Sequence, residues 1–138
     1  AVGGLAYWSA CSGHTQHLLA ELVADDAAVD EYIAGMRVKL GQAYRRVTSA
    51  LDALGIAYLP AEAAFFLICD LRSHLEAPTW EAERELWRRI LEDANVNLTP
   101  GEACRINEPG FFRLCYASES GDSVAEAIAR LGRLLASC

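Results

Sequence analysis

The feature that most constrains this chain is a long stretch of helical periodicity in its first half. Apolar residues recur at steps of three and four from about Val29 to Leu54, and Gly55 follows as a left-handed C-terminal cap. The stripe consists of Ile33, Met36, Leu40, Ala43, Val47, Ala50 or Leu51, and Leu54. A helix with one apolar side predicts a domain in which helices are laid across another layer of structure.

Short runs of β-forming residues supply that other layer. Residues 65–69 (Phe-Phe-Leu-Ile-Cys) are continuously apolar, which predicts a strand buried on both faces and covered by helices. Pro109 and Gly110 predict a turn that leads into a second strand ending near Ala117. Briefer strands are expected at 56–59 and 96–98.

Three more helices surround the strands in the predicted order. Ser12 or Gly13 begins the first, Thr79 caps the second, and Ser120 caps the last. The first helix has an apolar stripe formed by Leu18, Leu19, Leu22 and Val23. The fold class is therefore α/β, with a sheet of three or four strands covered by helices.

The chain divides into a short leading segment and one domain. Residues 1–13 are small, apolar and aromatic, which is unusual for a free terminus and indicates a segment that lies against another surface. We expect residues 14–138 to form a single small domain, because 138 residues suffice for one core and not for two.

Composition excludes several classes of partner. The net charge of −7 disfavours nucleic acid and anionic membranes, which both require clustered Lys and Arg. The five cysteines include no C-x-x-C pair, so we expect buried, reduced thiols in a cytoplasmic protein and no metal site. His14 and His17 stand three apart, but no third ligand is evident near them, and polar residues at a helix start explain them better.

One charged side chain interrupts the run after the Pro109-Gly110 turn. Side chains alternate along a strand, so Phe112, Leu114 and Tyr116 share one face while Arg113 lies on the other. A guanidinium among apolar neighbours is costly unless its charge is paired, and its planar fork fits a carboxylate with two hydrogen bonds. Two interpretations stay open from chemistry alone: an ion pair within the chain or simple solvation, and a receptor for an external carboxylate.

Three stretches, in this order and spacing, resemble a known family. They are residues 15–20 (Thr-Gln-His-Leu-Leu-Ala), residues 95–101 followed by Cys104, and residues 108–117 (Glu-Pro-Gly-Phe-Phe-Arg-Leu-Cys-Tyr-Ala). Together they resemble the C-terminal part of 1-aminocyclopropane-1-carboxylate (ACC) synthase and its aminotransferase relatives. These are fold-type I enzymes that depend on pyridoxal 5′-phosphate (PLP). The resemblance runs from about Ser12 to the chain end and implies the small domain, with the long helix as connector.

The resemblance implies a role for Arg113. In the family, the equivalent arginine binds the α-carboxylate of the amino-acid substrate, so the receptor interpretation now leads. The chain would be the substrate-binding small domain of an aminotransferase or an ACC-synthase-like lyase. Its partners would be an amino acid and the large PLP-binding domain, in an enzyme that forms a homodimer.

The family's cofactor-binding residues have no counterpart in this sequence. The family lysine that carries PLP lies in a Ser-x-Ser-Lys motif of the large domain, whereas Lys39, the one lysine here, lies mid-helix without that context. We therefore expect no catalytic or cofactor-binding residue in this chain and no covalent bond to PLP. The alternative is a truncated, non-catalytic relative that serves as a partner-binding or structural module.

One local departure concerns substrate choice. The family usually has glycine before the apolar strand near Pro60, whereas Ala63 and Ala64 precede Phe65 here. An extra methyl group that faced the cleft would crowd a substrate.

Overall fold

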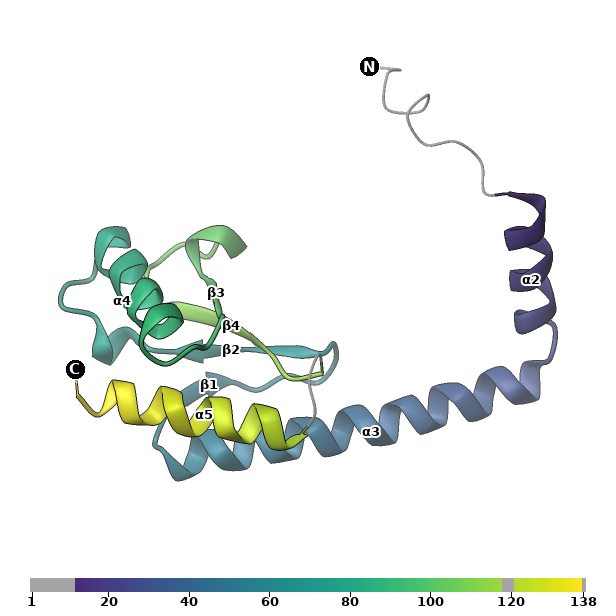
Figure 1. The fold of residues 1–138 in the computed structure, drawn as a ribbon, viewed down its shortest axis with the longest axis horizontal. Coiled ribbons are helices and arrows are strands. Elements are labelled where there is room, and N and C mark those ends of the chain that lie inside the picture. The colour runs from purple at the N-terminus through teal and green to yellow at the C-terminus, as the bar shows by residue number, and fades with distance from the viewer. Residues whose placement is uncertain (1–11, 118–120, 138) are drawn as a thin grey trace, which may run out of the picture. The chain divides into compact units, whose positions relative to one another are not determined.

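The computed structural model describes residues 12–117 and 121–137, and it confirms the predicted α/β class (Figure 1). Four helices and four strands form this part of the chain, joined by short 3₁₀ turns at Arg72–His74 and Glu102–Cys104. In chain order, the helices and strands are α2 (Gly13–Val23), α3 (Asp26–Ala53), β1 (Ala57–Leu59), β2 (Phe66–Asp70), α4 (Trp80–Glu92), β3 (Thr99–Pro100), β4 (Phe111–Cys115) and α5 (Gly121–Leu135).

The structure separates into two compact units, with the boundary between Val38 and Lys39 inside α3. The predicted division after residue 13 stays a prediction, because residues 1–11 lie outside the described residues. None of the helices described is both long and apolar enough to cross a membrane.

The first unit contains α2 and the beginning of α3. Ser12 caps α2 as predicted, since its hydroxyl accepts a hydrogen bond of 3.2 Å from the Thr15 N–H. The α3 helix begins at Asp26, earlier than expected, because the Asp25 carboxylate accepts from the N–H groups of Ala27 and Ala28. The predicted stripe of α2 is present but exposed: Leu18 and Leu22 are each 61% accessible.

The second unit is built on an antiparallel sheet with the strand order β1-β2-β4-β3. Leu67 and Leu114 pair across β2 and β4, and their side chains join α3, α4 and α5 in one core. The α5 helix lies beside the second half of α3, with Gly121 near Arg46 and Gly132 near Leu54 (Figure 1). Gly55 ends this packed segment in the predicted left-handed conformation, at φ 67°.

The prediction that β2 is buried on both faces is wrong. Leu67 is 1% exposed and Cys69 is fully buried, whereas Phe66 and Ile68 on the opposite face are only half-buried. The core cluster joins the helices to the Leu67 face alone. The opposite face, called here the open face, carries Phe66, Ile68 and Arg113.

The short strand expected at 96–98 is also misplaced, because β3 comprises Thr99 and Pro100. Val96 and Leu98 are buried, but their backbone groups bond to α4 and not to a strand. The Val96 N–H donates to the Ile90 carbonyl at 3.2 Å, and the Leu98 carbonyl accepts from the Trp87 indole at 2.8 Å. The apolar residues at 96 and 98 therefore reflect packing against α4 and not a strand.

Candidate functional site

The candidate site lies on the open face, where β4 runs between β2 and β3. Gly110 begins the approach to β4 with φ 100°, a conformation that favours glycine. From Phe112 onward the burial along β4 alternates as predicted: Phe112 and Leu114 are buried, while Arg113 and Cys115 are exposed. Phe111, which begins the strand, is buried as well. The alternation places the Arg113 side chain on the side of the sheet opposite the core.

Among the described residues, the Arg113 guanidinium contacts one hydroxyl and one aromatic ring. Its Nη2 donates to Thr99 Oγ1 at 3.3 Å, and its Cζ lies 5.3 Å from the centroid of the Phe66 ring. The acids nearest to Arg113 in the sequence are Glu108 and Glu119, at the two ends of the strand. Glu108 pairs with Arg72, and Glu119 lies outside the described residues. Across residues 12–117 and 121–137, no carboxylate forms an ion pair with Arg113, so most of its donors stay available.

The guanidinium of Arg72 differs from that of Arg113 because it pairs with two acids of the chain. Arg72 donates to both Asp70 oxygens, at 2.9 and 2.7 Å, reaches Glu108 at 3.3 Å, and lies 4.6 Å from the centroid of the Phe111 ring. These hydrogen bonds lower the pKa of the Asp70 carboxyl below its ordinary value. Arg72 therefore has acid partners within the chain, whereas Arg113 has none among the described residues.

The loop between β1 and β2 is held by two tyrosines. The Tyr116 hydroxyl donates to the Ala64 carbonyl at 3.0 Å, and the Tyr44 hydroxyl accepts from the Ala61 N–H at 3.2 Å. The two tyrosine rings meet edge to face with 5.7 Å between their centroids. Ala64, which follows the position singled out in the sequence, has a left-handed backbone at φ 71°.

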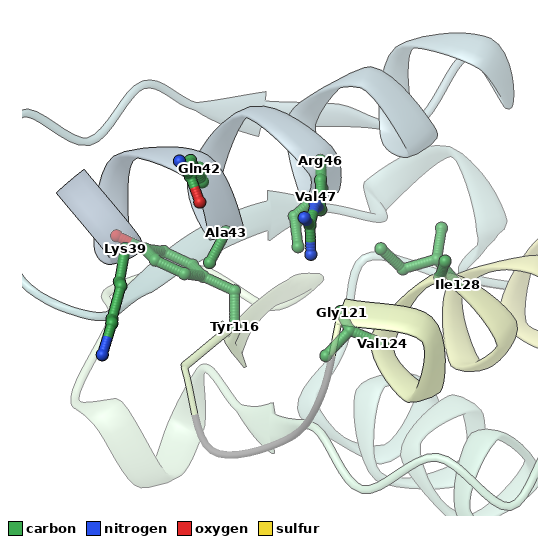
Figure 2. A pocket seen from close by; sticks show the side chains of 10 residues that line it. Lys39, Gln42, Ala43, Arg46, Val47, Tyr116, Gly121, Val124 and Ile128 are labelled. Atoms are coloured by element: carbon green, nitrogen blue, oxygen red, sulfur yellow. The ribbon is translucent and has the colours of Figure 1, made fainter.

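The only lysine of the sequence lines a different part of the second unit. Lys39 borders a groove of about 190 Å³ between α3 and α5, together with Gln42, Arg46 and Gly121 (Figure 2). Tyr116 extends from the end of β4 toward α3 in this groove. Since Tyr116 shares the core-side face of β4, the structure does not bring Lys39 and Arg113 to one site.

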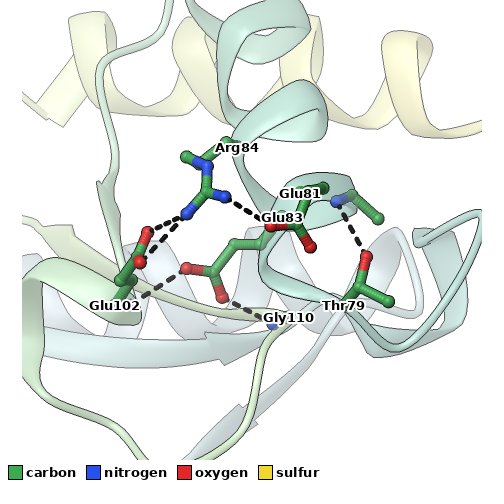
Figure 3. A network of polar contacts seen from close by, with 7 residues as sticks. Thr79, Glu81, Glu83, Arg84, Glu102 and Gly110 are labelled. Carbon is green, nitrogen blue, oxygen red and sulfur yellow. Dashed lines mark hydrogen bonds and ion pairs between the residues drawn. The ribbon is translucent and has the colours of Figure 1, made fainter.

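Glu83 is a buried acid that the sequence pattern did not single out. Its side chain is 0% exposed, whereas an acid in the first turn of a helix ordinarily stays in solvent and interacts favourably with the helix dipole. Its Oε1 accepts from the Glu102 N–H at 2.9 Å and its Oε2 from the Gly110 N–H at 2.6 Å (Figure 3). The signal was present in the spacing, because Glu83 precedes Leu86 and Ile90 on the same helical face.

The described cysteines differ in exposure, which corrects the expectation that the thiols are buried. Cys69 is buried and burial raises the pKa of its thiol to about 12. Cys104 is half-buried, and Cys115 is exposed on the same strand face as Arg113. All three are free thiols.

The sequence of the chain is similar to those of known enzymes. The chain is 38% identical to 1-aminocyclopropane-1-carboxylate synthase 6 of Arabidopsis thaliana over 120 residues, which are 87% of this chain and 24% of that enzyme. It is 39% identical to 1-aminocyclopropane-1-carboxylate synthase 2 of Cucurbita pepo, with the same coverage of each chain. The chain therefore spans about a quarter of the length of these relatives.

Solved structures show the same fold. An aromatic aminotransferase from Pyrococcus horikoshii OT3 matches with a TM-score of 0.73 at 21% identity, over 86% of this chain and 30% of that one. An aspartate aminotransferase from Thermotoga maritima matches with a TM-score of 0.62 at 26% identity, over 75% of this chain and 24% of that one. The family model for aminotransferase class I and II matches residues 4–131. On these grounds the chain belongs to the aminotransferase class I and II family of PLP-dependent, fold-type I enzymes.

Proposed function

We propose that this chain is the substrate-carboxylate-binding small domain of a PLP-dependent aminotransferase or ACC-synthase-like lyase, in which Arg113 binds the α-carboxylate of an amino acid. The observation that carries the proposal is a guanidinium on the open face that pairs with no carboxylate of the described residues, in contrast to the acid-paired Arg72. A charge held near apolar side chains without an acid is suited to a partner that arrives from outside.

The neighbours of Arg113 define what such a partner would meet. The Phe66 ring lies near one side of the guanidinium, which leaves the nitrogen edge as the route for a planar carboxylate. Thr99 Oγ1 accepts one N–H and so restricts rotation of the side chain. The half-buried Ile68, opposite Arg113 on β2, reduces the water around the pair. A carboxylate held by two hydrogen bonds fixes the orientation of the whole substrate.

The cofactor enters the proposal through the family and through residues outside this chain. PLP, when bound, serves as the electron sink for bonds at the substrate α-carbon. The residues described here do not fit a covalent role toward PLP, because Lys39 is exposed on α3 and shares no face with Arg113. The large domain would supply the lysine, and we infer a cytoplasmic homodimer as the complete enzyme.

The names of the relatives indicate amino-acid chemistry but do not define the substrate. A 1-aminocyclopropane-1-carboxylate synthase is named after its product, a small amino acid with one carboxylate. The solved neighbours named above are aminotransferases. Transamination and the synthase reaction would each require that the carboxylate of the substrate be bound, so the proposed role of Arg113 applies to either reaction.

The test is a chimeric enzyme in which this chain replaces the corresponding quarter of Arabidopsis 1-aminocyclopropane-1-carboxylate synthase 6. Arg113→Lys keeps the charge and loses the planar fork. We expect kcat/KM to fall roughly 10- to 100-fold, which corresponds to about 1.5–3 kcal/mol for a hydrogen bond to a charged group. The melting temperature should stay within about a degree of the parent, because Arg113 lies outside the core.

Arg88→Lys is the matched control. Arg88 is exposed on α4 and pairs with Glu85 and Glu92, so its replacement should leave kcat/KM unchanged. Unchanged turnover in Arg113→Lys would refute the carboxylate role. A loss of activity that follows the loss of folded protein would assign Arg113 to structure.

A non-catalytic binding module is the second candidate, and one observation favours it. The apolar stripe of α2 is exposed in this structure, with Leu18 and Leu22 each 61% accessible, which is a surface suited to a partner. The chimeric enzyme distinguishes the two candidates. If this chain is a module that has lost its catalytic geometry, the chimera should fold but have no activity.

A further inference from the structure

We propose that Glu83 is a positioning residue for the carboxylate site: its buried carboxylate fixes Arg113 and the Thr99 hydroxyl relative to each other. The inference rests on the proposed function for its biochemical consequence. Its structural part concerns only residues of the second unit.

The carboxylate of Glu83 is an unusual side chain to find in a core. It is 0% exposed, and within the part of the chain that the structure describes it makes no ion pair. Arg84, the adjacent cation, points to Glu81 and Glu102 instead (Figure 3). A buried carboxylate without a cation depends on hydrogen-bond donors, and Glu83 has two, both from backbone N–H groups.

These two donors lie at the same end of the antiparallel strand pair that carries the site. Gly110 immediately precedes β4, and Glu102 follows shortly after β3. The Gly110 carbonyl in turn accepts from the Leu71 N–H at 2.8 Å, so both polar groups of this residue are bonded. The carboxylate thus joins the beginning of β4 to the end of β3 and holds both against α4.

The pairing of β3 with β4 is too short to be rigid without such a connection. The ladder contains two residue pairs, Thr99 with Arg113 and Pro100 with Phe112, and Pro100 has no N–H to donate. A shift of this ladder would separate Thr99 Oγ1 from Arg113 Nη2, which are 3.3 Å apart. A fixed end on each strand opposes that shift, and this is the geometric role of Glu83.

The space around the carboxylate is also closely fitted. A Cβ atom added to Gly101 would lie 2.7 Å from the Phe111 carbonyl oxygen and 3.3 Å from Glu83 Oε2. Gly101 is therefore the residue that lets β3, β4 and the Glu83 side chain approach one another.

Glu83→Gln is the decisive variant, because it keeps the shape of the side chain. Its amide group offers one oxygen and one NH₂, so one backbone donor faces another donor and loses its acceptor. Glu85→Gln is the matched control: Glu85 is exposed on the same helix and pairs with Arg88.

In the chimeric enzyme, the readout is competitive inhibition by two probes, propionate and propylamine. A positioning role predicts that Glu83→Gln weakens inhibition by propionate about tenfold and leaves propylamine within twofold. Glu83→Gln combined with Arg113→Lys should bind propionate no more weakly than Arg113→Lys alone, because both changes remove the same contact. Glu85→Gln should match the parent for both probes.

If Glu83→Gln weakens inhibition by both probes equally, or if the two substitutions have additive effects on propionate, Glu83 only stabilises the fold. Either result would overturn the inference and leave the proposed role of Arg113 intact. No effect of Arg113→Lys on propionate would instead refute the proposed function.

A second measurement tests the positioning independently of activity. In the NMR spectrum of the 138-residue chain, Glu83→Gln should shift the Gly110 amide and also the Arg113 Nε–H and Thr99 amide. A change confined to Gly110 and Glu102, with Arg113 and Thr99 unmoved, would show that the carboxylate does not act on the site.

Discussion

The hydroxyl of Tyr116 donates a 3.0 Å hydrogen bond to the carbonyl oxygen of Ala64, a residue whose backbone is held in the left-handed region at φ 71°. The adjacent Phe65 carbonyl accepts from the Tyr116 N–H, also at 3.0 Å. One residue at the end of β4 therefore fixes the loop that leads into β2. A non-glycine residue in this conformation is strained, and the tyrosine contacts hold it there.

The first prediction is that Ala64→Gly stabilises the chain. Glycine adopts positive φ without steric cost, and this gain of about 1–2 kcal/mol exceeds the added chain entropy of about 0.5–1 kcal/mol. We expect the free energy of unfolding in urea to rise by about 0.5–1 kcal/mol. Ala63→Gly is the control: Ala63 does not have a positive φ, so its replacement by glycine should lower the free energy of unfolding. A fall in stability for Ala64→Gly would show that the loop tolerates the left-handed alanine without strain.

The second prediction is that Tyr116→Phe loosens the same loop. The Ala64 carbonyl loses its donor, which should cost about 1 kcal/mol of unfolding free energy. Hydrogen exchange at the backbone amide of Ala61 should accelerate, because the packing of Tyr44 against Tyr116 is also altered. Tyr32→Phe is the control: Tyr32 is 72% exposed and should have no effect on either measurement. Equal behaviour of the two variants would argue against a hydroxyl contribution.

The third prediction concerns the cysteines. Iodoacetamide at pH 8 should label the exposed Cys115 rapidly and leave Cys69 unmodified in the folded chain, since burial suppresses the reactive thiolate. Peptide mapping measures the labelling, with the urea-unfolded chain as control. Labelling of Cys69 at the rate of Cys115 would show that the sheet opens readily.

The raised pKa of Cys69 also makes the stability of the fold depend on pH. The unfolded thiol ionises at about pH 8.5 and the folded thiol at about 12, so the unfolded state loses its proton first. The free energy of unfolding therefore falls as the pH rises through this window.

The fourth prediction is that the isolated chain forms no specific covalent adduct with PLP. Lys39 is exposed on α3 and lacks the Ser-x-Ser-Lys context of the family lysine that carries PLP. Mixing the chain with PLP, reducing with borohydride and mapping the peptides should give only substoichiometric labelling. A single stoichiometric adduct on Lys39 would contradict the assignment of the cofactor lysine to another domain.

Local signals in the sequence predicted the parts of the fold that depend on neighbouring residues. Thr79 caps α4 as expected, with its hydroxyl accepting from the Ala82 N–H. The alternation around Arg113 and the left-handed Gly55 follow from single-residue chemistry and are confirmed. The role of Arg113 itself stays a prediction that the chimera must test.

The features that could not be predicted depend on contacts between distant segments. The spacing places Glu83 on the buried face of α4, but its burial requires two N–H groups that lie far along the chain, and no local pattern indicates these donors. The apolar run at residues 65–69 indicated a fully buried strand, although no helix of the described chain packs on its second face. The hydrophobicity of a strand does not show whether one or both of its faces are covered by other parts of the chain.

The two borders of the sheet each carry a proline, and this limits how the chain can associate. Pro60 directly follows β1, and Pro100 is one of the two residues of β3. A strand from another molecule that tried to extend the sheet beyond β3 would find a partner of two residues, one of which has no N–H. An edge strand of this kind resists the addition of further strands, which is the step that leads to fibrils. The open face that carries Arg113 can therefore stay accessible to solvent without the sheet serving as a template for aggregation.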